Sequence, residues 1–114
     1  MIIKNLNNKM VLCTRAEIAK TPFVRARGLL GRTIFEKGQG LVITACNSIH
    51  MFFMKFSIDA VFINQQGIVV GLVKNIKPNR ISAIYWNASS VIELPAGTIT
   101  HTAINLGDQI QMIE

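Results

Sequence analysis

The chain has 114 residues, a length that fits one domain and is too short for two independent hydrophobic cores. Half of its residues are hydrophobic and only 16% are charged, a composition that excludes an intrinsically disordered protein. Twelve Lys and Arg residues against six Asp and Glu residues leave a net charge of +6, which favours anionic partners without identifying one.

The first third of the chain predicts a strand, a short helix and a second strand. Residues 10–18 are β-compatible and mixed in polarity, which is typical of an edge strand. Thr21 and Pro22 indicate a helix start, because proline needs no hydrogen-bond donor in the first turn. Residues 23–30 then fit a short helix, and residues 41–46, which are rich in β-branched side chains, predict the next strand.

The middle of the chain predicts a further strand and a hairpin. Residues 49–56 are apolar and aromatic, and the length and flanks of this segment favour a strand over a helix. Residues 58–63 and 68–73 are two apolar runs separated by Asn64 to Gly67. This spacing predicts a β-hairpin in which Gly67 is left-handed after a type I turn.

The last part of the chain completes the predicted fold. Residues 90–94 predict a strand that ends at residues 95–97, and residues 98–105 fit one poor helical turn or an irregular connection. A tight turn then leads into a last strand at residues 109–113. About seven strands and one or two short helices predict a single α+β, β-dominated domain over residues 1–114. We expect its mostly antiparallel sheet to close toward a barrel, because closure removes exposed edges.

No segment is predicted to cross a membrane. The longest uncharged run, between Lys37 and Lys55, is polar in part and shorter than the about 20 apolar residues that a spanning helix needs. The N-terminus has no apolar leader of about 7–15 residues, although a leader removed earlier would leave no trace. We expect a cytoplasmic protein with reduced thiols, while a bridge between Cys13 and Cys46 stays open as an alternative.

A set of short motifs resembles a known family. The motifs are Arg25-x-x-Gly28-Leu29-x-x-Arg32, Cys46-Asn-x-Ile49-His50-Met51-x-x-Met54-x-x-x-Ile58-Asp59 and Ile92-Glu93-Leu94-Pro95-Ala96-Gly97-Thr98. Their order over residues 19–112 is similar to that of domain-of-unknown-function family 192, which occurs in bacteria and archaea. The resemblance supports the fold and the region of the site. It implies little about chemistry, because the family has no assigned activity.

Three residues of soft-metal chemistry, Cys46, His50 and Met54, are spaced too widely to share one ion. Residues four apart are about 13 Å apart on a strand, and the ends of this set would be about 12 Å apart on a helix. We therefore expect no metal and no cofactor. A nucleophilic role for Cys46 is also disfavoured, because this residue ends an apolar strand with no nucleophile motif around it.

Four ionisable residues, His50, Lys55, Asp59 and Glu93, interrupt runs that otherwise predict a core. An unpaired charge in such a place is unfavourable, so each is expected to face solvent or to have a partner. Lys55 with Asp59 and Arg32 with Glu93 are possible structural pairs. Alternatively these groups converge on a pocket, where Asp59 and Glu93 would provide acid–base chemistry.

A pair of arginines indicates an anion site. Arg25 and Arg32 lie near one face of the predicted helix, and Gly28 between them permits close approach of a ligand. Arginine binds carboxylate and phosphate groups through two parallel hydrogen bonds. We expect these arginines to flank a shallow site next to residues 49–56, with apolar walls that include Met54.

These features favour a binding function over catalysis. Although the isoelectric point is about 9.8, the basic residues are dispersed and no nucleic-acid motif is present, which argues against sequence-specific nucleic-acid binding. We interpret the protein as a non-catalytic binding or accessory domain for an anionic small molecule or an acidic protein partner. The alternative is a small hydrolase that uses Asp59, Glu93 or His50. The candidate site residues are Arg25, Arg32, His50, Met54, Asp59 and Glu93.

Overall fold

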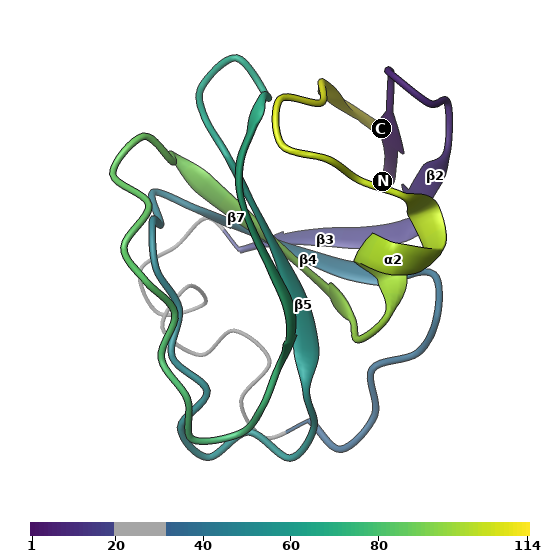
Figure 1. Ribbon diagram of the computed structural model, residues 1–114. Coiled ribbons are helices and arrows are strands. Elements are labelled where there is room, and N and C mark those ends of the chain that lie inside the picture. The colour runs from purple at the N-terminus through teal and green to yellow at the C-terminus, as the bar shows by residue number, and fades with distance from the viewer. Residues whose placement is uncertain (20–31) are drawn as a thin grey trace.

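A computed structural model describes residues 1–19 and 32–114, which form two sheets and one short helix (Figure 1). The smaller sheet has the order β2-β1-β8 and contains β1 (Ile2–Asn5), β2 (Val11–Cys13) and β8 (Ile110–Ile113). The larger sheet has the order β3-β4-β7-β5-β6 and contains β3 (Arg15–Ala19), β4 (Gln39–Thr44), β5 (Ile58–Ile63), β6 (Val69–Ile76) and β7 (Ser90–Pro95). The helix α2 spans Thr98–Thr102. The predicted helix at residues 23–30, with Arg25 and Gly28, lies outside the described residues.

The predicted β5–β6 hairpin is confirmed, and its turn is fixed by local chemistry. Asn64 Oδ1 accepts hydrogen bonds from the N–H groups of Gln66 and Ile68, at 3.0 and 2.9 Å. Gly67 has a φ of 78°, the left-handed conformation that the sequence predicts at this position. The asparagine therefore closes the turn, and the glycine allows the chain to enter β6 without strain.

The predicted strand at residues 10–18 is divided between the two sheets. The N–H groups of Thr14 and Arg15 both donate to the carbonyl oxygen of Gly38, at 3.0 and 2.9 Å. This contact separates β2, which pairs with β1, from β3, which pairs with β4 in parallel. Neither β1 nor the parallel pair was predicted, because both depend on partners far away in the sequence.

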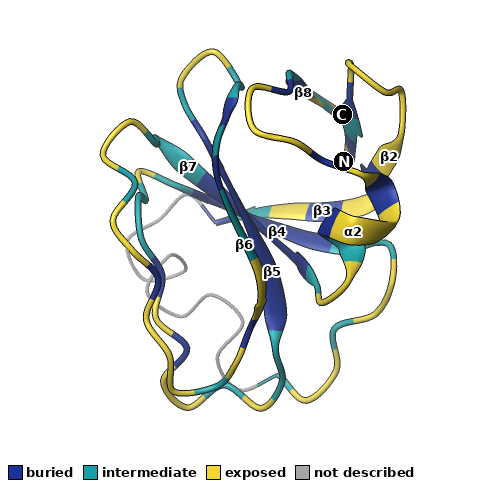
Figure 2. Ribbon diagram, in the orientation of Figure 1, coloured by how far each residue is buried: buried dark blue, intermediate teal, exposed yellow. Residues whose placement is uncertain are grey.

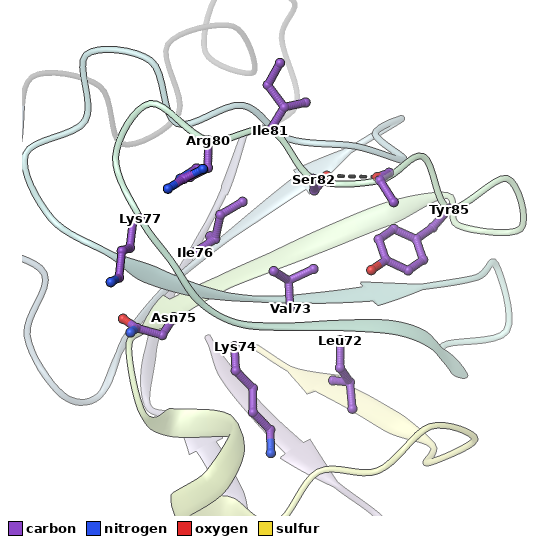
Figure 3. A pocket seen from close by; sticks show the side chains of 11 residues that line it. Leu72, Val73, Lys74, Asn75, Ile76, Lys77, Arg80, Ile81, Ser82 and Tyr85 are labelled. Carbon is purple, nitrogen blue, oxygen red and sulfur yellow. Dashed lines mark hydrogen bonds between the residues drawn. The ribbon is translucent and has the colours of Figure 1, made fainter.

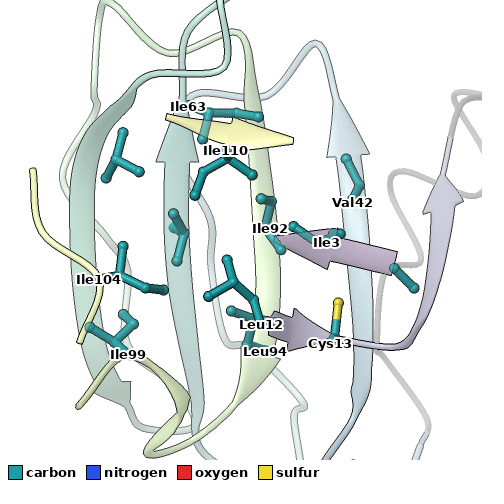
Figure 4. Packing of buried hydrophobic residues seen from close by; sticks show 13 residues of the cluster. Ile3, Leu12, Cys13, Val42, Ile63, Ile92, Leu94, Ile99, Ile104 and Ile110 are labelled. Carbon is teal, nitrogen blue, oxygen red and sulfur yellow. The ribbon is translucent and has the colours of Figure 1, made fainter. Parts of the chain in front are cut away.

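Side chains of the larger sheet alternate between two hydrophobic cores. On one face, Ile92 and Leu94 pack with residues of the smaller sheet such as Ile3 and Leu12, and we call this the inter-sheet core (Figure 4). On the other face, Phe62 and Val91 pack against residues of two long loops, and we call this the loop-side core. We name these loops the first loop (46–57) and the second loop (77–89). Every residue of β5 is buried between the two cores (Figure 2).

The α+β, β-dominated fold class is confirmed, but the sheets do not close into a barrel. In the larger sheet, β3 and β6 are the outer strands and do not pair with each other. Both faces of this sheet are already covered, one by the smaller sheet and one by the loops, so burial of the core does not require closure. One consequence is that β6 keeps an open edge beyond Val69, whose N–H and C=O groups bond to Asp108 and Gly107.

The predicted strand at residues 49–56 is wrong, because this segment lies in the first loop. Phe53 has a φ of 64°, and the N–H of Met54 donates to the carbonyl oxygen of Met51 at 3.2 Å, which makes a turn. In this segment only His50 has a β-bridge, with Ile81. The helix α2 is confirmed as a single turn. No helix in the described ranges is long and apolar enough to cross a membrane.

Candidate functional site

The two long loops lie side by side and are joined by backbone hydrogen bonds. The N–H of Ser82 donates to the carbonyl oxygen of Ile49 at 2.9 Å, and the N–H of Ile49 donates to Ser82 Oγ at 2.9 Å. Further along, the N–H of Met51 donates to the carbonyl oxygen of Arg80 at 2.8 Å. The first loop therefore supports the second loop and fixes the position of its residues 80–82.

Tyr85 anchors the second loop to the sheet. Its ring stacks on Phe62 of β5, with ring centroids 4.4 Å apart and an interplanar angle of 25°. The same ring lies directly over Gly71 of β6, where a Cβ atom would clash with it. Glycine at this position thus lets the tyrosine approach the backbone, and the second loop is held at a fixed height above β6.

The space between β6 and the second loop is a groove of about 580 Å³, which we call the β6 groove (Figure 3). Its apolar wall includes Val73, Ile76 and Tyr85. Its cationic residues are Lys74, Lys77 and Arg80. Figure 3 shows the side chains of Lys77 and Arg80 together at one end, whereas Lys74 extends to the opposite side. The groove therefore combines an apolar wall with positive charge at one end, where Lys77 and Arg80 lie.

A β-bulge directs the side chains at the end of β6. Ile58 pairs with Ile76 and Ala60 pairs with Val73, so β6 has one more residue than β5 between these two pairs. Asn75 in the bulge has a φ of 53°. Because a bulge bends its strand and changes the direction of the following side chains, it places residues 74–77 around the groove.

Asp59 holds this bulge and also the start of α2. Its side chain is 1% exposed, and its Oδ1 accepts from the N–H of Asn75 at 2.8 Å. Its Oδ2 accepts from the N–H groups of Gly97 and Ile99, at 3.1 and 2.8 Å. Asp59 thus bonds to backbone donors instead of the predicted partner Lys55, and its carboxylate has a structural role.

Glu93 lies on the opposite face of the sheet in a very different environment. It is 5% exposed on β7, and its Oε1 has no hydrogen-bond partner among the described residues. Burial raises the pKa of Glu93 to about 7, while the positive charge of Arg32 opposes this rise. Glu93 is therefore a buried acid that takes up a proton near neutral pH.

Arg32 lies between two carboxyl groups. Its Nη2 is 3.4 Å from Glu17 Oε2, and its charge also acts on Glu93. Glu17 pairs with Leu41 across the sheet and Leu41 pairs with Glu93, so the two glutamates share one face and are separated by one strand. The predicted association of Arg32 with Glu93 is electrostatic, and Glu17 is the closer partner of this guanidinium group.

The structure separates most of the predicted site residues. Asp59 pairs with Leu94 in the register of β5 and β7, so it faces the inter-sheet core, whereas Glu93 faces the loop-side core. These two carboxyl groups do not face a common substrate, and acid–base catalysis by this pair gains no support from the geometry. Of the six predicted residues, Arg32 and Glu93 are brought together.

The remaining predicted residues lie in the first loop. His50 is exposed, and its ring stacks on Phe52 with centroids 5.3 Å apart. Met54 is half-buried and packs against the loop-side core. Arg25 and Gly28 lie outside the described residues, so the predicted site between Arg25 and Arg32 stays a prediction.

The two cysteines belong to different cores, and no disulfide joins Cys13 to Cys46. Cys13 is buried in the inter-sheet core, and burial raises its pKa to about 11. Cys46 packs against the loop-side core, and its Sγ lies 3.0 Å from the carbonyl oxygen of Ser48. Within residues 1–19 and 32–114, no three His, Cys, Asp or Glu side chains lie close enough together to hold a metal ion.

Comparisons with known proteins identify relatives along almost the whole chain. Residues 3–112 match domain-of-unknown-function family 192, described as "Uncharacterized ACR". The chain is 36% identical over 114 residues to the "UPF0127 protein" of Thermococcus sibiricus, covering 96% of this chain and 73% of that protein. Neither description assigns an activity.

Two crystal structures share the fold. One, a protein of unknown function from Novosphingobium aromaticivorans, has a TM-score of 0.84 at 20% identity, covering 97% of this chain and 82% of that one. The other, a suggested transcription regulator from Sinorhizobium meliloti, has a TM-score of 0.81 at 20% identity, covering 96% of this chain and 89% of that one. At this level of identity the likeness extends to the fold alone.

Proposed function

We propose from the β6 groove that this chain, which belongs to domain-of-unknown-function family 192, is a binding domain for an acidic, extended segment of a partner protein. No activity is assigned to that family. The proposal retains the binding function that the sequence predicts. It moves the anion site from Arg25 and Arg32 to Lys77 and Arg80.

The observation that carries this proposal is the unbalanced charge of the groove. In the described chain, Arg15 lies 4.0 Å from Glu36 and Arg32 lies 3.4 Å from Glu17, whereas other exposed lysines such as Lys37 and Lys55 form no ion pair. The groove differs from these single positions because it gathers several cations. The cations of the groove have no such carboxylate partner among the described residues, and no acidic residue lines the groove. A partner that supplies carboxylates would provide the missing charge, and its apolar side chains would fit the wall of the groove.

The position of the groove beside an outer strand supports an extended partner. Because β6 ends the larger sheet, one row of its backbone N–H and C=O groups is not used within that sheet. At the start of this row Val69 bonds to Gly107 and Asp108, so the available part of the edge lies beyond Val69. An added peptide strand uses such a row for its own hydrogen bonds, and alternate side chains then meet opposite sides of the strand. Lys74 and the bulge at Asn75 oppose pairing with a second copy of the same edge, because like charges and a bent strand disfavour it.

The test uses a synthetic peptide of alternating glutamate and valine with both ends capped, titrated into the ¹⁵N-labelled protein. We expect chemical-shift changes at β6 and at Arg80 to Tyr85, and an affinity that falls as salt is added. Lys77→Gln and Arg80→Gln should each weaken binding about threefold to fivefold, which corresponds to about 0.6–1 kcal/mol. The matched control is Arg15→Gln, which removes the same charge from an exposed position outside the groove and should leave the affinity unchanged.

Three results would overturn the proposal. The first is the absence of shift changes at β6 when the peptide is in large excess. The second is an equal loss of affinity in Arg15→Gln and Arg80→Gln, which would show that net charge alone attracts the peptide. The third is tighter binding of a single-stranded oligonucleotide than of the peptide at the same salt concentration, which would make the groove a nucleic-acid site.

A further inference from the structure

A second cavity lies on the other side of the larger sheet, between β2 and α2, which are neighbours in Figure 1. It has a volume of about 480 Å³ and is formed by residues 10–14, 37–38 and 95–98 together with His101 and Thr102. We call it the β2–α2 cleft. It shares no lining residue with the β6 groove.

The walls of the β2–α2 cleft are mainly apolar. Leu12 and Cys13 line it and are almost fully buried, at 4% and 2% exposure. Met10 and Val11 also line it, yet they remain 40% and 44% exposed. Apolar side chains that line a cavity and still face solvent are available for contact with a ligand.

The polar groups of the cleft divide into two classes. The hydroxyl groups of Thr98 and Thr102 already donate to the carbonyl oxygens of Pro95 and Thr98, at 2.7 and 2.6 Å. Lys37 and His101, in contrast, are exposed and form no ion pair with a described carboxylate. No acidic residue lines the cleft. Apart from the exposed hydroxyl group of Thr14, its available polar side chains are therefore basic.

We propose that the β2–α2 cleft binds a small amphipathic carboxylate, a molecule with one anionic head and an apolar body. The apolar body would lie against Leu12, Met10 and Val11, and the head would lie beside Lys37 and His101. The volume falls within the range of about 300–1,000 Å³ that is usual for small-molecule sites. The charge of Lys37 and the ring N–H donor of His101 complement the head, and the absence of lining acids removes competition for it.

The buried thiol of Cys13 is consistent with a binding site rather than a reactive one. Its pKa is raised to about 11 by burial, so the nucleophilic thiolate is scarce at neutral pH. Its Sγ packs closely over Gly40 of β4, where a Cβ atom would lie 2.8 Å from the sulfur. Cys13 therefore contributes a fixed apolar surface to the wall of the cleft.

The test measures binding of butyrate, hexanoate and octanoate by calorimetry and by ¹⁵N chemical shifts. If the body of the ligand enters an apolar cleft, affinity should increase about threefold to fourfold for each added CH₂ group. Shift changes should occur at Gly38, Gly97 and His101, and not at β6. Octanol, which has the same chain and no charge, should bind more weakly than octanoate.

Variants separate this site from the β6 groove. Lys37→Gln and His101→Gln should each weaken octanoate binding at least threefold, and Ala96→Phe, at an exposed position that lines the cleft, should abolish it by filling the space. Lys77→Gln, the matched control, should leave octanoate binding unchanged. The spectrum of each free variant verifies that it is folded.

The proposal is overturned by any of three outcomes. The first is that octanoate at millimolar concentration produces no chemical-shift changes at the cleft. The second is that butyrate binds as tightly as octanoate, which would indicate that only the carboxylate head contacts the surface. The last is an equal effect of Lys37→Gln and Lys77→Gln, which would assign the binding to overall charge.

Discussion

Two buried carboxyl groups on neighbouring strands, Asp59 on β5 and Glu93 on β7, lie on opposite faces of the same sheet. Asp59 accepts three backbone hydrogen bonds, from Asn75, Gly97 and Ile99. Glu93 has an oxygen with no partner among the described residues, and its pKa is raised to about 7. Nearly equal burial thus has opposite consequences, because the supply of hydrogen-bond donors decides whether a buried carboxyl group is stabilised as an anion or as a neutral acid.

The difference between the two faces has a structural cause. On the inter-sheet side, the bulge of β6 and the start of α2 both direct N–H groups at Asp59. On the loop side, Glu93 projects from a central strand between Leu41 and Ala60 of the neighbouring strands. Neither of these side chains has a donor to offer, and the nearest identified charge is Arg32, which also contacts Glu17.

The largest loss of stability is expected from substitution of Asp59. Asp59→Ala removes all three acceptor contacts and leaves buried N–H donors unsatisfied, so the free energy of unfolding should fall by about 4 kcal/mol. Asp59→Asn keeps one acceptor oxygen and should lose about half as much. Urea denaturation at pH 7 measures both variants.

The control for Asp59 is Glu36→Gln, which removes one negative charge from an exposed pair and should change stability by less than about 0.5 kcal/mol. If Asp59→Asn and Glu36→Gln had the same effect, the three hydrogen bonds would contribute little. The contrast between the two faces would then rest on burial alone.

Removal of the carboxyl group of Glu93 is expected to raise stability at high pH, the opposite of the effect expected at Asp59. Between its usual pKa near 4.5 and its folded pKa of about 7, the folded protein holds a proton that the unfolded chain has released. Stability should therefore decrease as pH rises through this window, by up to about 3 kcal/mol from this one group. Glu93→Gln has no carboxyl group to ionise, so it should be more stable than the parent protein at pH 8 and similar to it at pH 4.

Denaturation at several pH values checks this prediction, with Glu17→Gln as the matched control on the same face. Glu17 is exposed, and its removal should leave the slope between pH 4.5 and 7 in place. A Glu93→Gln variant that retained the full slope would show that other groups titrate in this window. A variant less stable than the parent protein at pH 8 would show that the ionised carboxylate is stabilised after all.

Local sequence was sufficient to predict the parts of the fold that depend on neighbouring residues. The β5–β6 turn follows from Asn64 and Gly67, which are three residues apart and make their contacts within the turn. The parallel pairing of β3 with β4 and the pairing of β1 with β8 depend on distant partners, and neither was predicted. The strand predicted at residues 49–56 is wrong because Ile49 and Met51 are buried by contact with a sheet face while the backbone of the segment bonds to the second loop.

The candidate site was predictable only in part for the same reason. Glu93 and Asp59 stand out in the sequence as charges within apolar runs, but the face that each occupies depends on strand register. Lys77 and Arg80 are close in sequence, although nothing local indicates that the second loop returns over β6. That return requires Tyr85 to pack on Gly71, a contact between residues that have no sequence motif in common.

The smallest change in stability is expected from substitution of Arg32. Its dependence on pH distinguishes the contribution of Glu93 from that of Glu17. Arg32→Gln should destabilise the protein by about 0.5–1 kcal/mol at pH 8, where Glu93 is ionised and benefits from the positive charge. At pH 5 Glu93 is protonated in the folded state, so only the exposed contact with Glu17 is lost and the change should be close to zero. Removing the guanidinium group also removes the influence that opposes the raised pKa of Glu93, so the decline of stability should extend to higher pH. An equal loss at pH 5 and pH 8 would assign the whole effect to Glu17. It would leave Glu93 with no partner of any kind among the described residues, which makes the contrast with Asp59 still sharper.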